Sequence, residues 1–213
     1  VNMTKMTAHS LSELGVSVFA RCQNLKEVDF PKLEIVGESA FAGCSKLSTI
    51  NMQSIVTIKK AAFSNSRVKS LSFPNLNMLE ENAFSDCSSL ETVDFPYLEA
   101  CGDSCFKNCY KLGSIALEKV RYIGNLAFST CIALYSFEAN NVIEIGSHVF
   151  LSCSNLTIFE AQKLNYTGVN SFFSCLALQK ITFPFLSIVR EEAFAYCHSL
   201  INISLPNVAI IEA

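Results

Sequence analysis

Cysteine is the residue type in this chain with the most evident capacity for chemistry, and its spacing decides what that chemistry is. The 213 residues include ten cysteines, and eight of them recur at one position of a repeated pattern: Cys22, Cys44, Cys87, Cys109, Cys131, Cys153, Cys175 and Cys197. Stacked repeats carry parallel side chains about 4.8 Å apart, whereas a disulfide needs Cβ atoms about 3.8 Å apart that point toward each other. We therefore interpret these residues as a ladder of buried thiols rather than as a disulfide scaffold.

A second cysteine pattern resembles a metal-binding run. Cys101, Cys105 and Cys109 are each four residues apart, but zinc or an iron–sulfur cluster needs ligands that converge, usually with a second pair. The three residues fall at positions that an earlier repeat fills with Val36, Ala40 and Cys44, so the repeat itself accounts for them. The sequence predicts no metal site and no cofactor.

Catalytic and nucleic-acid-binding patterns are missing from the sequence. The three histidines occupy different repeat positions, and the chain has no nucleophile elbow, HExxH motif or glycine-rich phosphate loop. A net charge of −3 without a basic run gives nucleic acid or an anionic membrane little to bind. No apolar run approaches the roughly 18 residues of a membrane span. We expect no enzyme, no nucleic-acid partner and no membrane insertion in this segment, and an enzymatic role would need a separate domain.

The repeats that carry these residues are marked by nine phenylalanines: Phe19, Phe41, Phe63, Phe84, Phe106, Phe128, Phe150, Phe172 and Phe194. Seven of the eight steps between them are 22 residues and one is 21. A period of this length indicates one supersecondary unit stacked into a solenoid. We predict a single array of about nine repeats over residues 1–213. Because neither end has a polar cap, we expect a segment of a longer array whose open ends can self-associate.

One unit, residues 25–44, has the pattern LxxVxFPxLxxVGxxAFxxC. Alternation of apolar and polar residues up to Phe30 predicts a short half-buried strand that Pro31 ends. A second extended piece is often followed by glycine, as at Gly37, which suggests a corner with positive φ. Ala40, Phe41 and the cysteine that follows form an apolar stripe typical of a short helix or 3₁₀ turn.

This pattern resembles the treponemal type of leucine-rich repeat found in BspA-like surface proteins, and the resemblance covers essentially the whole chain. It implies an α/β fold, a right-handed horseshoe solenoid with a parallel concave sheet and short helices or 3₁₀ turns on the convex side. It also implies a non-catalytic, adhesin-type ectodomain that binds host or neighbouring-cell macromolecules and is cell-surface or secreted. The alternative is a cytoplasmic scaffold or sensor repeat, which suits reduced cysteines better.

Binding residues are expected at the exposed positions that the repeat leaves free to vary. The strand positions between the buried residues are small, polar and mildly acidic, and we predict Asp29, Asp94, Glu138 and Glu160 as contacts to a protein or glycoprotein ligand. Phe173 and Tyr196 form a second candidate on the convex side. The alternatives are a merely solvated strand face and aromatic side chains that tuck beneath the convex loops.

Overall fold

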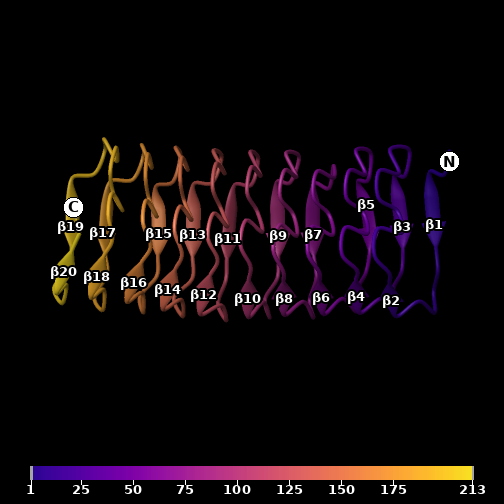
Figure 1. Cartoon of the computed structure of the whole chain (residues 1–213), viewed down its shortest axis with the longest axis horizontal. Helices are drawn as coiled ribbons and strands as arrows, with labels where there is room; N and C mark the ends of the chain where they lie inside the picture. The colour runs from indigo at the N-terminus through magenta and orange to yellow at the C-terminus, as the bar shows by residue number, and fades with distance from the viewer. Residues whose placement is uncertain (1, 213) are drawn as a thin grey trace.

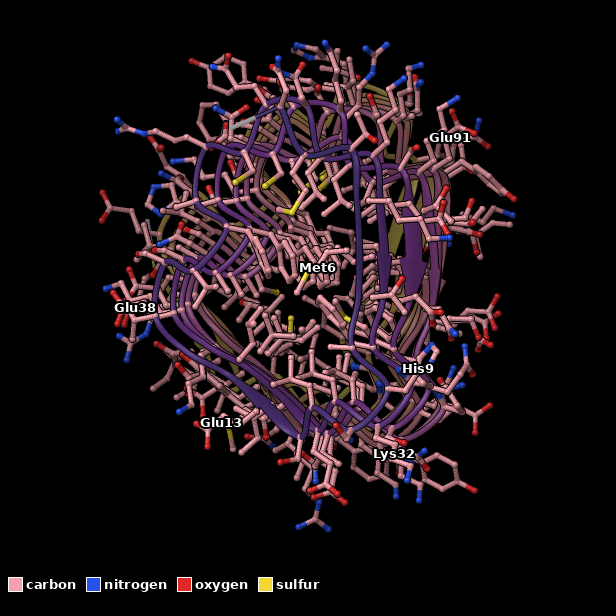
Figure 2. The ribbon with its side chains drawn as sticks, turned by 90° about the vertical axis from the view of Figure 1, so that its right-hand side faces the viewer. Met6, His9, Glu13, Lys32, Glu38 and Glu91 are labelled. Atoms are coloured by element: carbon pink, nitrogen blue, oxygen red, sulfur yellow. The ribbon has the colours of Figure 1, made fainter. Side chains whose placement is uncertain are left out.

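Each repeat forms one coil, and the coils stand side by side along the long axis of the molecule (Figure 1). The computed structural model describes residues 2–212. Figure 2 looks along the stack: side chains fill the interior, with Met6 among them, while Lys32, Glu38 and Glu91 point outward on different sides. A single core therefore runs through all the coils, as the repeat period predicts.

The first side of each coil is a three-residue strand whose middle residue points inward. Val28, in the middle of its strand, is fully buried, and its neighbours Glu27 and Asp29 are partly exposed. We call this side the three-residue face. Its strands are β1 (Lys5–Thr7), β3 (Glu27–Asp29), β5 (Thr49–Asn51), β7 (Ser70–Ser72), β9 (Thr92–Asp94), β11 (Ser114–Ala116), β13 (Ser136–Glu138), β15 (Ile158–Glu160), β17 (Lys180–Thr182) and β19 (Asn202–Ser204).

The second side is a column of two-residue strands, which we call the two-residue sheet. All its strands are parallel, and they follow one another in a single ten-stranded sheet from β2 to β20. They are β2 (Glu13–Leu14), β4 (Ile35–Val36), β6 (Thr57–Ile58), β8 (Met78–Leu79), β10 (Ala100–Cys101), β12 (Tyr122–Ile123), β14 (Glu144–Ile145), β16 (Tyr166–Thr167), β18 (Ile188–Val189) and β20 (Ile210–Ile211).

The three-residue face, by contrast, is interrupted twice. Its strands form three separate parallel sheets: β1 to β5, β7 to β15, and β17 with β19. Figure 1 shows the wider spacing between β5 and β7 and between β15 and β17. The first interruption lies at the single 21-residue repeat. In this repeat the three residues Ser66-Arg67-Val68 take the place of the four residues Cys44-Ser45-Lys46-Leu47 of the preceding coil, so the connection to β7 is one residue shorter. Neighbouring coils thus stay paired on one side and part on the other.

The third side consists of turns, and the expected short helices or 3₁₀ turns are wrong for residues 2–212. Two residues of each unit have left-handed φ, such as Ser39 at 53° and Gly43 at 71°. Between them, the Phe41 N–H donates across to the Ala62 carbonyl of the next coil at 2.7 Å, while the Ala42 N–H donates back to Ser39 at 3.1 Å. A helix needs consecutive right-handed residues bonded within one segment. The described chain is therefore a parallel β-solenoid without helices.

Glycine at the corner after the two-residue strand has a different role from the expected one. Gly43 lies in the turns of the third side, which we call the turn column, and it is the one glycine with positive φ in the described chain. The prediction of positive φ at Gly37 and its equivalents is therefore wrong. A Cβ on Gly37 would lie 2.3 Å from the Leu14 carbonyl oxygen, and a Cβ on Gly168 would lie 2.3 Å from the Gly146 carbonyl carbon. Glycine is present there because the backbones of adjacent coils approach each other closely.

The core confirms the repeat assignment of buried positions. Leu25, Val28 and Phe30 are all fully buried, as predicted. The repeat phenylalanines stack on one another; Phe41 and Phe63, for example, have ring centroids 5.1 Å apart and an interplanar angle of 11°. Burial of these rings is the main source of stability that every coil shares.

Two coils keep the core volume while exchanging the positions of large and small residues. Phe137 and Phe159 occupy the position of Val28, and each is followed two residues later by alanine, Ala139 or Ala161, where Phe30 stands in the earlier coil. Such volume-conserving exchanges are the best tolerated in packed cores. The rings consequently change orientation, and Phe159 meets Phe183 of the next coil edge-on at an interplanar angle of 86°. We attribute the second break to this change, since the break lies between the coil of Phe159 and the coil of Phe183.

Candidate functional site

The four predicted acids occupy one column of the three-residue face. Asp29, Asp94, Glu138 and Glu160 are each the last residue of their strand, β3, β9, β13 and β15, and the strand register aligns this position from coil to coil. The structure brings only two of them together. Glu138 and Glu160 are directly paired in adjacent strands, whereas Asn51 and Ser72 stand between Asp29 and Asp94, on either side of the first break.

The two aspartates are engaged within the protein. Asp29 Oδ1 accepts a hydrogen bond from Asn51 Nδ2 at 2.7 Å, and its Oδ2 lies 3.3 Å from His9 Nε2. Asp94 Oδ2 accepts a hydrogen bond from Ser72 Oγ at 3.0 Å. These contacts satisfy part of each carboxylate's bonding capacity, so the aspartates have less left for a ligand.

The two glutamates are less committed. Glu138 accepts one long hydrogen bond from Ser136 Oγ at 3.5 Å, and Glu160 has no side-chain partner among residues 2–212. Two like charges directly opposite each other on a sheet destabilise it. Glu138 also lines a hollow of about 260 Å³ together with Ala116, Glu118 and Asn140. Of the four predicted acids, this pair has the geometry of an available cationic contact.

The aromatic candidate on the turn column forms a contacting pair. The ring centroids of Phe173 and Tyr196 lie 4.8 Å apart at 53°. Phe173 is half-buried, whereas Tyr196 is 59% exposed and has a φ of 59°, a conformation that bulky residues rarely adopt. The same position has left-handed φ in every unit, so this conformation belongs to the turn, and it is the exposure of the Tyr196 ring that makes it a candidate contact.

The cysteine ladder is an internal feature. Six of its eight members are buried, and the thiols donate to carbonyl groups one coil away; Cys131 Sγ, for example, lies 3.1 Å from the Phe106 oxygen. Burial raises the pKa of the Cys153 thiol to about 12 and that of Cys105 and Cys109 well above the usual range. No group of His, Cys, Asp or Glu in the described chain has the arrangement of a metal site.

A hollow lined by cations lies beside the first break, and the sequence reasoning missed it. Lys26, Lys46, Ser48, Arg67 and Lys69 surround about 530 Å³ of open space. These residues form no contiguous basic run in the sequence, because successive coils contribute them. The signal that would have found them is the repeat register, since Lys26, Ser48 and Lys69 occupy the same position of three consecutive units.

No helix in residues 2–212 combines the length and apolar character that crossing a bilayer requires. Comparison with known families gives a match over most of the chain. Residues 2–113 and 133–213 match the family described as "BspA type Leucine rich repeat region", in six copies. Among curated proteins, none matches the chain.

Solved structures of similar fold come from several bacteria. A leucine-rich-repeat protein of T. pallidum is 24% identical, with a TM-score of 0.61 over 84% of this chain and 79% of its own. A leucine-rich cell surface protein of Faecalibacterium prausnitzii is 19% identical, with a TM-score of 0.60 over 96% and 88%. The pneumococcal vaccine antigen PcpA is 17% identical, with a TM-score of 0.55 over 99% and 66%. At these identities, the likeness shows the shared fold.

Proposed function

Since the chain belongs to the BspA-type leucine-rich-repeat family, we propose that it is a non-catalytic interaction module that binds a protein or glycoprotein at the outer surface of a cell. The observation that carries this proposal is the column of exposed positions along the three-residue face, where side chains vary on a fixed backbone. Extended faces of this kind are the surfaces that solenoid proteins use for binding. The description of the F. prausnitzii neighbour as a cell surface protein supports the location.

The ligand contact that we propose is centred on Glu138 and Glu160. The two carboxylates are adjacent, exposed and unpaired within the described chain, so a lysine or arginine of a partner could be held between them. Asp29 and Asp94 extend the same column with fewer free oxygen atoms. Phe173 and Tyr196 remain a second proposed contact, on the turn column.

The test uses the labelled chain and intact cells. Charge reversal at Glu138 and Glu160 should reduce cell binding about tenfold or more, and binding should weaken with salt because exposed charges act over only about 10 Å at 0.1 M ionic strength. The pair Phe173→Ser and Tyr196→Ser tests the other surface, and circular dichroism checks folding of each variant. Unchanged binding in both double variants would exclude both surfaces.

An intracellular scaffold or sensor is the second candidate, and the ten free cysteines favour it, because thiols persist in reducing compartments. The two candidates differ in compartment. Antibody labelling of intact and permeabilised cells separates them: labelling of intact cells supports the surface module, and labelling only after permeabilisation supports the scaffold.

Self-association through an end coil is also proposed. In a chain of these residues alone, no further coil covers Ile201 and Ile211, which are 80% and 67% exposed, and exposed edge strands pair readily with a second copy. Analytical ultracentrifugation over a concentration series checks this: a growing dimer fraction that Ile201→Lys abolishes would support it, and a monomer at every concentration would contradict it.

A further inference from the structure

Four cations gather around the hollow beside the first break of the three-residue face. The hollow of about 530 Å³ is lined by Lys26, Lys46, Ser48, Arg67 and Lys69. Glu91, which is labelled in Figure 2, is the residue of the following coil that is equivalent to Lys69, so it shows on which side of the coil the hollow lies. The chain as a whole carries a net charge of −3, so the positive charge here is a local concentration and not part of a general surplus.

No carboxylate neutralises these four cations within residues 2–212. The ion pairs of the described chain involve other basic residues, and Lys46 makes the one side-chain hydrogen bond of the group, from Nζ to Asn24 Oδ1 at 3.0 Å. The nearest acid along the column is Glu91, whose carboxylate lies 4.0 Å from Lys111 Nζ. The positive charges of the hollow are therefore available to an anionic ligand.

The missing residue that breaks the face also frees backbone donors there. In the preceding coil the N–H groups of Ser48 and Thr49 both donate to the Lys26 carbonyl, at 3.0 and 3.1 Å. The equivalent N–H groups, those of Lys69 and Ser70, have no acceptor in the part of the chain that the structure describes. Successive backbone N–H groups that have lost their acceptors favour anion binding. Ser48 and Lys69, the residues on either side of this gap, both line the hollow.

We propose that this hollow binds a sulfated oligosaccharide. Its cations come from three successive coils and so span about 10 Å, which suits a chain bearing several anionic groups better than a single anion. The Ser48 hydroxyl, which lines the hollow, adds a neutral donor and acceptor for sugar hydroxyls.

Nucleic acid fits the hollow less well. No aromatic side chain lines it, so the bases of a single strand would have nothing to stack on. A duplex requires an extended basic stripe, whereas the four cations of this hollow are confined to three successive coils. The site lies in different coils from Glu138 and Glu160, so the proposal goes beyond the protein-binding role and does not depend on it.

The experiment is calorimetric titration of the chain with a heparin-derived hexasaccharide at physiological ionic strength. The wild-type chain should bind it, and should bind a fully desulfated hexasaccharide at least about tenfold more weakly. The triple variant Lys26→Gln, Lys46→Gln and Lys69→Gln should lose about a hundredfold in affinity, the loss expected for three exposed charged contacts.

A matched control carries the same change in net charge at distant coils: Lys119→Gln, Lys163→Gln and Lys180→Gln. Its affinity should stay within about threefold of wild type. A second variant inserts one serine after Ser66, which restores the four-residue spacing of the preceding coil and leaves every cation in place. Restored backbone pairing should then remove the free N–H donors and weaken binding about tenfold.

The outcomes separate the proposal from its alternatives. Equal losses in the two triple variants would mean that net charge alone drives association, and would overturn a built site. An oligonucleotide of the same charge that binds as tightly as the hexasaccharide would overturn the assignment to sulfated saccharide. Absence of binding by the wild-type chain would refute the proposal outright, while the cell-binding test of Glu138 and Glu160 would still stand or fall separately.

Discussion

The two strand columns of this solenoid respond differently to the same irregularity. The two-residue sheet passes the one-residue deletion near Arg67 without losing a strand pair, since β6 and β8 remain in register through Thr57 with Met78 and Ile58 with Leu79. On the opposite side of those coils, β5 and β7 belong to separate sheets. The two-residue sheet therefore connects all the coils, whereas the three-residue face loses strand pairing where the repeat length changes.

The physical reason lies in how closely the backbones approach. Beside the two-residue sheet, several units have glycine, and a Cβ there would meet the backbone of the adjacent coil at under 3 Å. Such a joint leaves no room for slippage. At the first break itself, where Lys59 and Glu80 take the glycine position, backbone bonds hold the coils together: the Lys59 N–H donates to the Val36 carbonyl and the Glu80 N–H to the Ile58 carbonyl, both at 3.0 Å. The strands of the three-residue face are also backbone-paired within each of its three sheets, but this pairing lapses at two joints: half-buried Ile50 lies beside the first break and half-buried Phe159 beside the second. Binding features are expected where the scaffold tolerates change, and the cationic hollow lies at such a place.

The largest expected effect comes from the core that both columns share. Phe106 is fully buried and stacks on Phe84 and Phe128 at 5.7 and 5.3 Å. Phe106→Ala should lower the free energy of unfolding by about 3–5 kcal/mol, because it removes a buried ring and leaves a cavity between two others. Urea denaturation followed by circular dichroism measures the change. A loss below about 1 kcal/mol would contradict the continuous core.

A pair of glycine substitutions compares the two columns directly. Gly168→Ala, at the margin of the two-residue sheet, should destabilise the chain by about 1–3 kcal/mol, because the new Cβ would meet Gly146 and Ser147 backbone atoms at 2.3 to 2.5 Å. Gly113→Ala, beside the three-residue face, meets only the Tyr135 ring at 3.4 Å and should change stability by less than about 0.5 kcal/mol. Equal melting temperatures for the two variants would remove the proposed difference in packing.

A further effect, absent at neutral pH, concerns the thiols behind the turn column. Burial raises the pKa of Cys153 to about 12, compared with about 8.5 for an unfolded thiol. The unfolded chain therefore ionises first, so the contribution of this thiol is fully present below about pH 8.5 and is lost as pH rises toward 12. In that window the stability of Cys153→Ser should fall less steeply than that of wild type, by up to about 1.4 kcal/mol per pH unit. Parallel slopes from pH 9 to 10 would mean that Cys153 is not buried as described.

The features that recur in every repeat could be predicted from the sequence. The positions of Leu25, Val28 and Phe30 follow from alternation and period, and all three are buried as predicted. The predicted helices failed because the apolar stripe at Ala40 and Phe41 fits turns as well as a helix. Left-handed φ at Ser39 and at its equivalents, none of which is glycine, leaves no compositional signal.

The breaks show why the candidate sites were only partly predictable. The 21-residue step is evident in the sequence, but a deletion of one residue can also be accommodated in a turn. Nothing in a single repeat indicates which side of the coil loses its strand pairing. The free backbone donors of the cationic hollow depend on the loss of pairing on this side, because the Lys69 N–H would otherwise donate to the preceding coil as the Ser48 N–H does. Placement of Glu138 beside Glu160, by contrast, follows directly from the repeat register.

Hydrogen exchange in a single coil tests the central contrast most directly, because β7 and β8 belong to the same coil and lie on different sides of it. The amides of Asn77 and Met78 donate to the Val56 carbonyl at 3.0 and 3.3 Å, whereas those of Lys69 and Ser70 have no acceptor among residues 2–212. Site-resolved exchange should show Lys69 and Ser70 exchanging about as fast as unprotected peptide amides while Asn77 and Met78 remain protected. Equal protection of the two pairs would mean that the three-residue face is closed in solution, and would contradict the account.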